Sequence, residues 1–318
     1  MTGAEAESLL LEGKIATGIA FQYRGQRATA RARGEVILAA GAVNSPKLLE
    51  LSGIGRPDIL QALGIPVQHQ LDGVGENLQD HLQIRTVFKV RNTRTLNTRY
   101  HNLVSRAGMG VEYALRRSGP LSMAPSQLGI FARSDPRMAT PDLEYHIQPL
   151  STDRLGEPLH RFDAVTVSVC NLRPESRGSI HIASRDLRMQ PSIRPNYLST
   201  PVDRDVAANS IRHARRLMQA EALTPYAPEE MLPGPQFSSD AELAAKAGDI
   251  ATTIFHPVGT CKMGADAMAV VDPKLRVHGL AGLRVVDASI MPNIVSGNTN
   301  SPVIMIAERA ADFILQTR

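Results

Sequence analysis

Two short apolar segments, each ending in small or acidic residues, constrain the fold most strongly. Residues 35–41 read Glu-Val-Ile-Leu-Ala-Ala-Gly, and residues 283–287 read Leu-Arg-Val-Val-Asp. The first run is typical of a buried parallel strand, whose carboxyl end is where α/β sheets bind ligands. The second run predicts a short strand that ends in an acid. The small residues 39–41 leave room for a ligand to approach the backbone, although plain packing of the strand against a helix explains them equally well. Asp287 stands where a carboxylate can accept a hydrogen bond from a ribityl or ribose hydroxyl.

Helices are predicted next to both segments. Ser45 and Pro46 predict a helix that has Ser45 as its cap and Pro46 at its first position. A second helix is predicted from Asn300 to about Gln316, with Pro302 in its first turn. Its amino end carries partial positive charge from unpaired amides, which stabilises a nearby negative charge.

The middle of the chain, residues 83–250, has a different texture. Strand-like alternation recurs with little helical pattern between, at residues 84–90, 143–148, 164–171 and 177–184. One helix is predicted from a Thr200 cap to about Ala220, and the Pro- and Gly-rich residues 224–240 are predicted to form a loop. This pattern favours a mainly antiparallel α+β domain beside an α/β domain.

Composition excludes several classes of protein. The length of 318 residues suggests roughly two domains. The net charge of +4 is small, and no block of five like charges occurs, so nucleic acid binding is not indicated. Two cysteines give no disulfide framework, and neither a signal peptide nor an apolar run of membrane-spanning length is present. A cytoplasmic protein is therefore expected.

Two turn-rich segments near the carboxyl end carry candidate catalytic groups. His256 lies in Phe-His-Pro-Val-Gly-Thr-Cys-Lys-Met-Gly, residues 255–264, and Asn298 lies in Gly-Asn-Thr-Asn, residues 297–300. Histidine has a pKa suited to proton transfer, whereas an amide can only donate or accept hydrogen bonds. Taken singly, each is more often structural. His81 has no second ligand at suitable spacing, so it is interpreted as structural and no metal site is predicted.

Taken together, these stretches resemble a known family. Residues 41–55 read Gly-Ala-Val-Asn-Ser-Pro-Lys-Leu-Leu-Glu-Leu-Ser-Gly-Ile-Gly, which is similar to the second signature of the glucose–methanol–choline (GMC) flavin oxidoreductases. The stretches 256–264, 282–289 and 297–300 resemble the same family in the same order, and the likeness extends over nearly the whole chain. Asn298 resembles the choline and alcohol dehydrogenase branch.

The resemblance implies FAD-dependent oxidation of an alcohol to an aldehyde or ketone, by removal of the hydroxyl proton and hydride transfer to the flavin. The family's catalytic pair maps onto His256 and Asn298, and its FAD contacts map onto Ala40, Gly41, Asp287, Ala288, Thr299 and Asn300. Substrate contacts are expected at Met123, Gln127 and Phe255. Gln127 is neutral near a position where the choline-type pattern has a carboxylate, which favours a neutral alcohol. The electron acceptor stays open.

The same resemblance divides the chain into expected domains. Residues 1–57 and 251–318 are expected to be parts of a discontinuous FAD-binding domain, 58–82 a connection that covers the flavin, and 83–250 the substrate-binding domain. The family begins with a Gly-x-Gly-x-x-Gly turn, and this sequence contains none. The chain therefore resembles a carboxyl-terminal portion that needs an amino-terminal segment to complete its cofactor site. A truncated, non-catalytic remnant and a GMC-like hydroxynitrile lyase are the alternatives.

Overall fold

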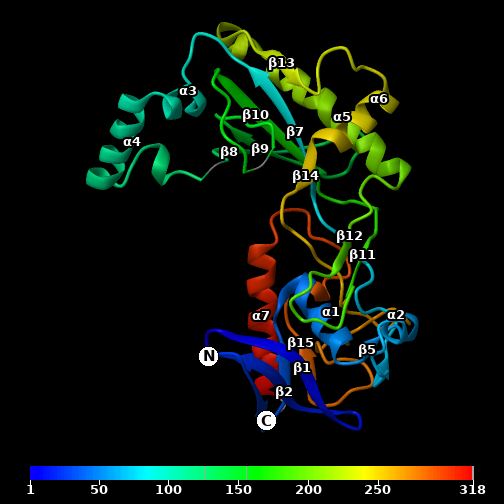
Figure 1. The fold of residues 1–318 in the computed structure, drawn as a ribbon. Coiled ribbons are helices and arrows are strands. Elements are labelled where there is room, and N and C mark those ends of the chain that lie inside the picture. Colours follow the sequence, from blue (N-terminus) through cyan, green and yellow to red (C-terminus); the bar gives the residue numbers. More distant parts are fainter. Residues whose placement is uncertain (125, 155, 317–318) are drawn as a thin grey trace. The chain divides into compact units, whose positions relative to one another are not determined.

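The computed structural model describes residues 1–124, 126–154 and 156–316. The chain folds into two compact units (Figure 1). The first unit comprises residues 1–80, 176–197 and the chain from Phe255 onward, and the second comprises residues 81–175 and 198–254. Each unit has its own hydrophobic core.

The first unit opens with a three-stranded antiparallel sheet. Its strands are β1 (Ala4–Glu12), β2 (Ile15–Tyr23) and β3 (Gln26–Arg31), paired in that order. Arg24 and Gly25 form the two-residue turn between β2 and β3, and both have a positive φ. A two-residue turn needs this conformation at both positions if its twist is to match the twist of the strands.

A parallel pair of strands holds the two constraining segments side by side. β4 (Val36–Leu38) pairs with β15 (Leu283–Val285), although the paired residues Leu38 and Val285 are 247 positions apart in the sequence. Residues 35–41 were predicted to form a buried parallel strand and residues 283–287 a short strand, and Leu38, Leu283 and Val285 are buried. The apolar faces of α1 (Gly41–Leu51) and α7 (Asn300–Leu315) join the same core.

Helix α1 begins four residues before Ser45, so the predicted cap is wrong. Its N-cap is Ala40, and Pro46 lies inside the helix. Ser45 is fully buried, and its hydroxyl bonds to the amide of Ala40 and to Asp287 rather than to an amide two or three residues later. A tertiary partner thus replaces the local bond on which the prediction depended.

Shorter elements complete the first unit. These are β5 (Ile54–Gly55) paired with β6 (His69–Gln70), α2 (Pro57–Ala62), β11 (Ser179–His181) paired with β12 (Ser192–Arg194), and the 3-10 turn η3 (Ala288–Ile290). The predicted substrate domain, 83–250, includes 176–197, but the structure packs that segment in the first unit. Contacts with residues far away in the sequence hold it there. The amide of Ile180 donates to the Gly75 carbonyl, and His181 contacts Glu50. Gly178 and Leu78 exchange two backbone hydrogen bonds.

The second unit is an antiparallel sheet with helices on one face. The strand order is β13 (Glu229–Leu232), β7 (Leu82–Lys89), β10 (Ala164–Asn171), β9 (Leu143–Gln148) and β8 (Leu128–Ala132), and β14 (Ala251–Thr253) also pairs with β7. Helices α5 (Pro201–Met218) and α6 (Asp240–Ile250) contribute Ile211 and Leu243 to a core with Tyr145 and Val167 of the sheet. The predicted strands 143–148 and 164–171 and the Thr200 cap are confirmed.

Two parts of the second unit differ from the sequence-based expectation. The predicted loop 224–240 contains β13, which adds to the edge of the sheet through β7. Helices α3 (Leu96–His101) and α4 (Leu103–Arg116) were not predicted; α4 leaves Leu103, Val104 and Leu115 exposed. A short 3-10 turn at Pro120–Ser122 follows α4, and another at Glu221–Tyr226 follows α5. Within the described ranges, none of the helices combines the length and the apolar character needed to cross a membrane.

Candidate functional site

A buried carboxylate links the carboxyl ends of β4 and β15. One oxygen of Asp287 accepts hydrogen bonds from the Gly41 amide at 3.0 Å and the Ser45 hydroxyl at 2.5 Å. The other accepts from the amide of Ser289 at 2.8 Å. A carboxylate offers about four acceptor positions, and protein groups occupy three of these. Asp287 therefore fixes the turn that begins α1, and at most one of its acceptor positions is left for a ligand hydroxyl.

The backbone beside this carboxylate is open. Gly41 has a φ of +79°, which favours glycine, and a Cβ added there would meet no atom within 4 Å. Ala40 is exposed, and Ala288 is partly exposed at the start of the turn after β15. Small residues at the carboxyl ends of parallel strands suit a ligand that approaches the main chain closely. This arrangement fits one side of a dinucleotide or flavin site.

Asp80 holds the segment that carries His256. One of its oxygens accepts from the backbone amide of His256 at 2.9 Å, and the other accepts from the Tyr197 hydroxyl. Burial lowers the pKa of the His256 imidazole, and the negative charge of Asp80 opposes that shift only partly. The imidazole is therefore neutral at neutral pH, which is the form that can accept a proton.

The two motif segments run beside each other. The amides of Cys261 and Met263 donate to the carbonyls of Ser289 and Ile290 at 2.9 and 2.8 Å. Gln79 connects to the same region, because its side chain accepts from the Ile294 amide and donates to the Pro292 carbonyl. The structure thus brings residues 259–263 and 288–290 together. That His256 and Asn298 face one pocket stays a prediction.

Of the remaining predicted residues in the first unit, Asn298, Asn300 and Phe255 are exposed, and Thr299 is partly exposed. Asn298 is exposed, and Thr299 and Asn300 stand at the amino end of α7, where unpaired amides favour negative charge. Phe255 is 67% exposed and has a φ of +65°. Most of the Phe255 surface is therefore accessible to solvent.

Met123 and Gln127, the other predicted substrate residues, belong to the second unit. Both are exposed, and the amide nitrogen of Gln127 lies 3.6 Å from the sulfur of Met123. The backbone of Gln127 is fixed, because its amide donates to the carbonyl of Ile147 in β9. The two side chains are thus neighbours on one surface.

Sequence reasoning missed Asp80, Gln79 and Ser45 as positioning residues. Asp80 and Gln79 directly precede His81, in a segment that the sequence marked only as a cover for the flavin. His81 itself is fully buried, with its ring nitrogen 3.3 Å from the Leu172 carbonyl, as expected of a structural histidine. The sequence signal that could have identified Gln79 and Asp80 is the run of three polar residues, 79–81, in one turn-rich segment. Polar side chains in such segments often position a neighbouring loop.

Comparison with known families agrees with this architecture. Residues 1–83 and 174–307 match two models that are both described as GMC oxidoreductase. Because one family accounts for both ends of the chain, the chain belongs to the GMC oxidoreductases. Proteins of this family are flavoenzymes, and the mixed α/β fold class is the one predicted.

Individual relatives match over almost the whole chain. An alcohol dehydrogenase (acceptor) of Pseudomonas putida is 41% identical over 319 residues, which covers 99% of this chain and 58% of the relative. The mitochondrial choline dehydrogenase of Homo sapiens is 43% identical over 317 residues, covering 98% and 53%. The chain therefore spans little more than half the length of these relatives.

Solved structures give the same result. Pyridoxine 4-oxidase from Mesorbium loti has a TM-score of 0.84 and 30% identity, covering 97% of this chain and 56% of that one. A formate oxidase has a TM-score of 0.91 and 28% identity, covering 99% and 60%. Both are oxidases, as their names state.

Proposed function

We propose that this chain forms the substrate side and part of the cofactor site of a FAD-dependent enzyme that oxidises an alcohol to an aldehyde or ketone. The observation that carries the proposal is the pairing of segments 259–263 and 288–290, next to a neutral His256 that Asp80 holds by its backbone. Relatives named as alcohol and choline dehydrogenases support the same chemistry.

In this proposal His256 accepts the hydroxyl proton of the alcohol, and Asn298 orients the oxygen through its amide. Such a base contributes about 10²–10⁴-fold to the rate. The flavin, when bound, supplies the acceptor for the hydride that leaves the carbinol carbon. Phe255, Met123 and Gln127 are proposed to contact the alcohol, and a neutral Gln127 suits an uncharged substrate.

Ala40, Gly41, Asp287 and Ala288 are proposed to hold the FAD by backbone contacts at the strand ends. Thr299 and Asn300 place the amino end of α7, and its partial positive charge, toward negative charge on the ligand. We also propose that a further segment with a Gly-x-Gly-x-x-Gly turn completes the site, because these 318 residues contain no such turn. Purified residues 1–318 that retain FAD tightly would contradict this step.

The catalytic role is tested in a polypeptide that joins this chain to a dinucleotide-binding segment. With His256→Ala, kcat for alcohol-dependent dye reduction is expected to fall by about 10²–10⁴-fold while the flavin absorbance stays unchanged. His101→Ala is the matched control, because His101 is exposed and lies in the second unit. Unchanged turnover in the His256 variant would remove it from the role of base.

Two alternative functions have distinct results in the same assay. A hydroxynitrile lyase on this fold would cleave cyanohydrins without bleaching its flavin when alcohol is added anaerobically. A non-catalytic remnant would neither bleach nor cleave, even when the cofactor site is complete. A cytoplasmic, reducing location is also proposed, since Cys170 and Cys261 are buried and form no disulfide with each other.

A further inference from the structure

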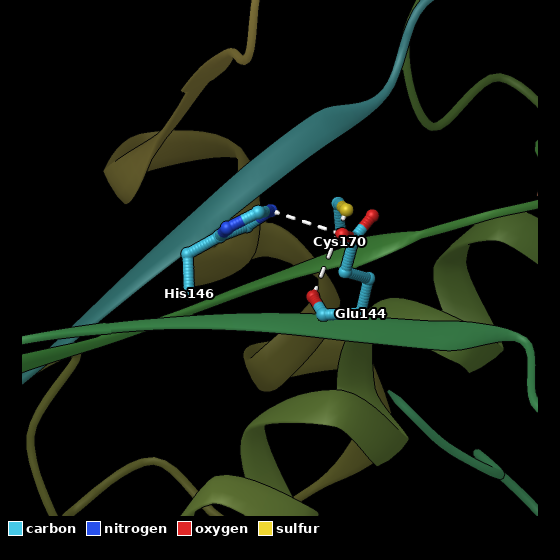
Figure 2. A group of neighbouring side chains, drawn as sticks. All are labelled: Glu144, His146 and Cys170. Atoms are coloured by element: carbon cyan, nitrogen blue, oxygen red, sulfur yellow. Dashed lines mark hydrogen bonds and ion pairs between the residues drawn. The ribbon is translucent and has the colours of Figure 1, made fainter. Parts of the chain in front are cut away.

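Three chemically distinct side chains meet on the face of the second unit's sheet that α5 and α6 do not cover. Glu144 and His146 are two residues apart on β9, so they point to the same face. Cys170 on β10 is the direct cross-strand partner of Glu144. The alternate residues Leu143, Tyr145 and Val169 point to the opposite face, into the core with the helices. Figure 2 shows the three side chains directed toward one another from the two neighbouring strands.

The distances within this trio are those of a small coordination site. One candidate ligand atom from each residue lies within 4.8 Å of the other two. The Nε2 atom of His146 is 3.6 Å from a carboxylate oxygen of Glu144. With bond lengths of about 2.0–2.3 Å, two ligands of a tetrahedral zinc ion stand roughly 3.5 Å apart. The histidine and the carboxylate therefore already have the separation that a shared ion would impose.

Burial supplies a second, independent observation. Glu144 is 3% exposed, and its Oε2 atom has no hydrogen-bond partner among the described residues. A buried oxygen of this kind loses its water without compensation, which is costly for a carboxylate. Cys170 is fully buried and His146 is mostly buried. A cation bound between them would satisfy that oxygen and offset the cost of burying it.

We propose that Glu144, His146 and Cys170 bind one divalent zinc ion in the second unit. This departs from the sequence-based expectation of no metal site, because that expectation relied on spacing along the chain and these ligands meet across two strands. A thiolate, a carboxylate and a neutral imidazole around Zn²⁺ give a site with no net charge, which suits a buried location. Three protein ligands leave a fourth position for water.

The binding step has a defined proton balance. Zinc binds the thiolate form of Cys170, so the thiol proton is released to solvent as the metal–sulfur bond forms. The step involves no change of oxidation state. Since protons compete with the metal for the ligands, affinity is expected to fall as the pH is lowered.

The test uses the untagged 318-residue chain, loaded with Zn²⁺ and dialysed, with bound metal counted by elemental analysis. We expect one equivalent, and Co²⁺ in its place should give the charge-transfer absorption of a cobalt–thiolate bond. Cys170→Ser should abolish that absorption and weaken zinc binding by about 10-fold or more. Cys261→Ser is the matched control, because Cys261 is equally buried but lies in the first unit, and it should retain both signals.

Two results would overturn the proposal: no zinc on the folded chain, or zinc that Cys170→Ser and Cys261→Ser retain equally. Far-ultraviolet circular dichroism shows whether each variant is folded. If Cys170→Ser does not fold, Glu144→Gln and His146→Gln take its place, since both leave the thiol intact. Loss of binding in both variants supports the site, and retention in both contradicts it.

Discussion

Asp80 is the residue through which the environment of His256 can be tuned. Its carboxylate accepts from the His256 amide, and its charge raises the pKa that burial lowers. Asp80→Asn keeps an acceptor for the amide but removes the charge. The pKa of His256 should then fall further below its ordinary value of about 6.5. Because the neutral imidazole is the active form of the proposed base, the acid limb of the kcat–pH profile should move to lower pH.

The measurement for Asp80→Asn is the kcat–pH profile of the cofactor-complete enzyme, compared with that of the unchanged protein. Glu76→Gln is a suitable control, because it also removes one negative charge from the first unit while Glu76 contacts Arg56 and His181 rather than His256. A shift of the acid limb to higher pH in Asp80→Asn would contradict the argument.

His181 and Glu50 form a second buried pair in the first unit. The Nδ1 atom of His181 is 2.7 Å from Glu50, which is fully buried and also accepts from the Ile182 amide. Burial alone lowers the pKa of His181, but hydrogen bonds and charges from Glu50 and Glu76 outweigh it and raise the pKa. A raised pKa in the folded state means that the pair stabilises the fold fully below about pH 6.5. This stabilisation is lost as the pH rises through the folded-state pKa.

The expected result is a pH-dependent effect of His181→Gln on the free energy of unfolding. The variant should be destabilised most near pH 5, and the difference from the unchanged chain should narrow toward about pH 8. Urea unfolding at several pH values measures it. His101→Gln, at an exposed position of the second unit, should show no such trend. A difference that widens with rising pH would reverse the assigned sign.

At the scale of elements, prediction from sequence succeeded where the signal was local. Thr200 and Pro201 specify the start of α5, and the alternation in 143–148 and 164–171 specifies β9 and β10. It failed where a residue far away in the sequence determines the local structure. Helix α1 begins at Gly41 because Asp287, 246 residues away, binds the Gly41 amide. Residues 229–232 form the strand β13 because they pair with β7 at the edge of the sheet.

The Thr200 cap allows a quantitative test at this scale. Its hydroxyl accepts from the Asp203 amide at 3.2 Å, which satisfies one of the unpaired amides at the start of α5. Thr200→Ala should destabilise the second unit by about 0.5–2 kcal/mol in urea unfolding, whereas Thr200→Ser keeps the hydroxyl and should cost much less. Equal losses in the two variants would show that the methyl group, rather than the hydrogen bond, matters.

For the whole molecule, the sequence indicated an α/β part and an α+β part but misplaced one boundary. Residues 176–197 follow the strands of the second unit in the chain, and their strand-like pattern resembles those strands. Their partners are Gly75, Leu78 and Glu50 in the first unit, which sequence periodicity cannot reveal. The candidate site was predictable to the level of residue types and segments, because the motifs are contiguous. Its positioning network was not, since Asp80 and Ser45 act across long sequence separations.

Two separate cores predict two cooperative steps in unfolding. Ile211 is fully buried in the core of the second unit, and Leu283 is buried in that of the first. Each substitution to Ala should cost about 2–5 kcal/mol in its own unit. In amide hydrogen exchange, Ile211→Ala should therefore lower protection in β10 and α5 while β4 and β15 keep theirs, and Leu283→Ala should do the reverse. Equal loss of protection across both units in either variant would mean that the chain unfolds as one cooperative body.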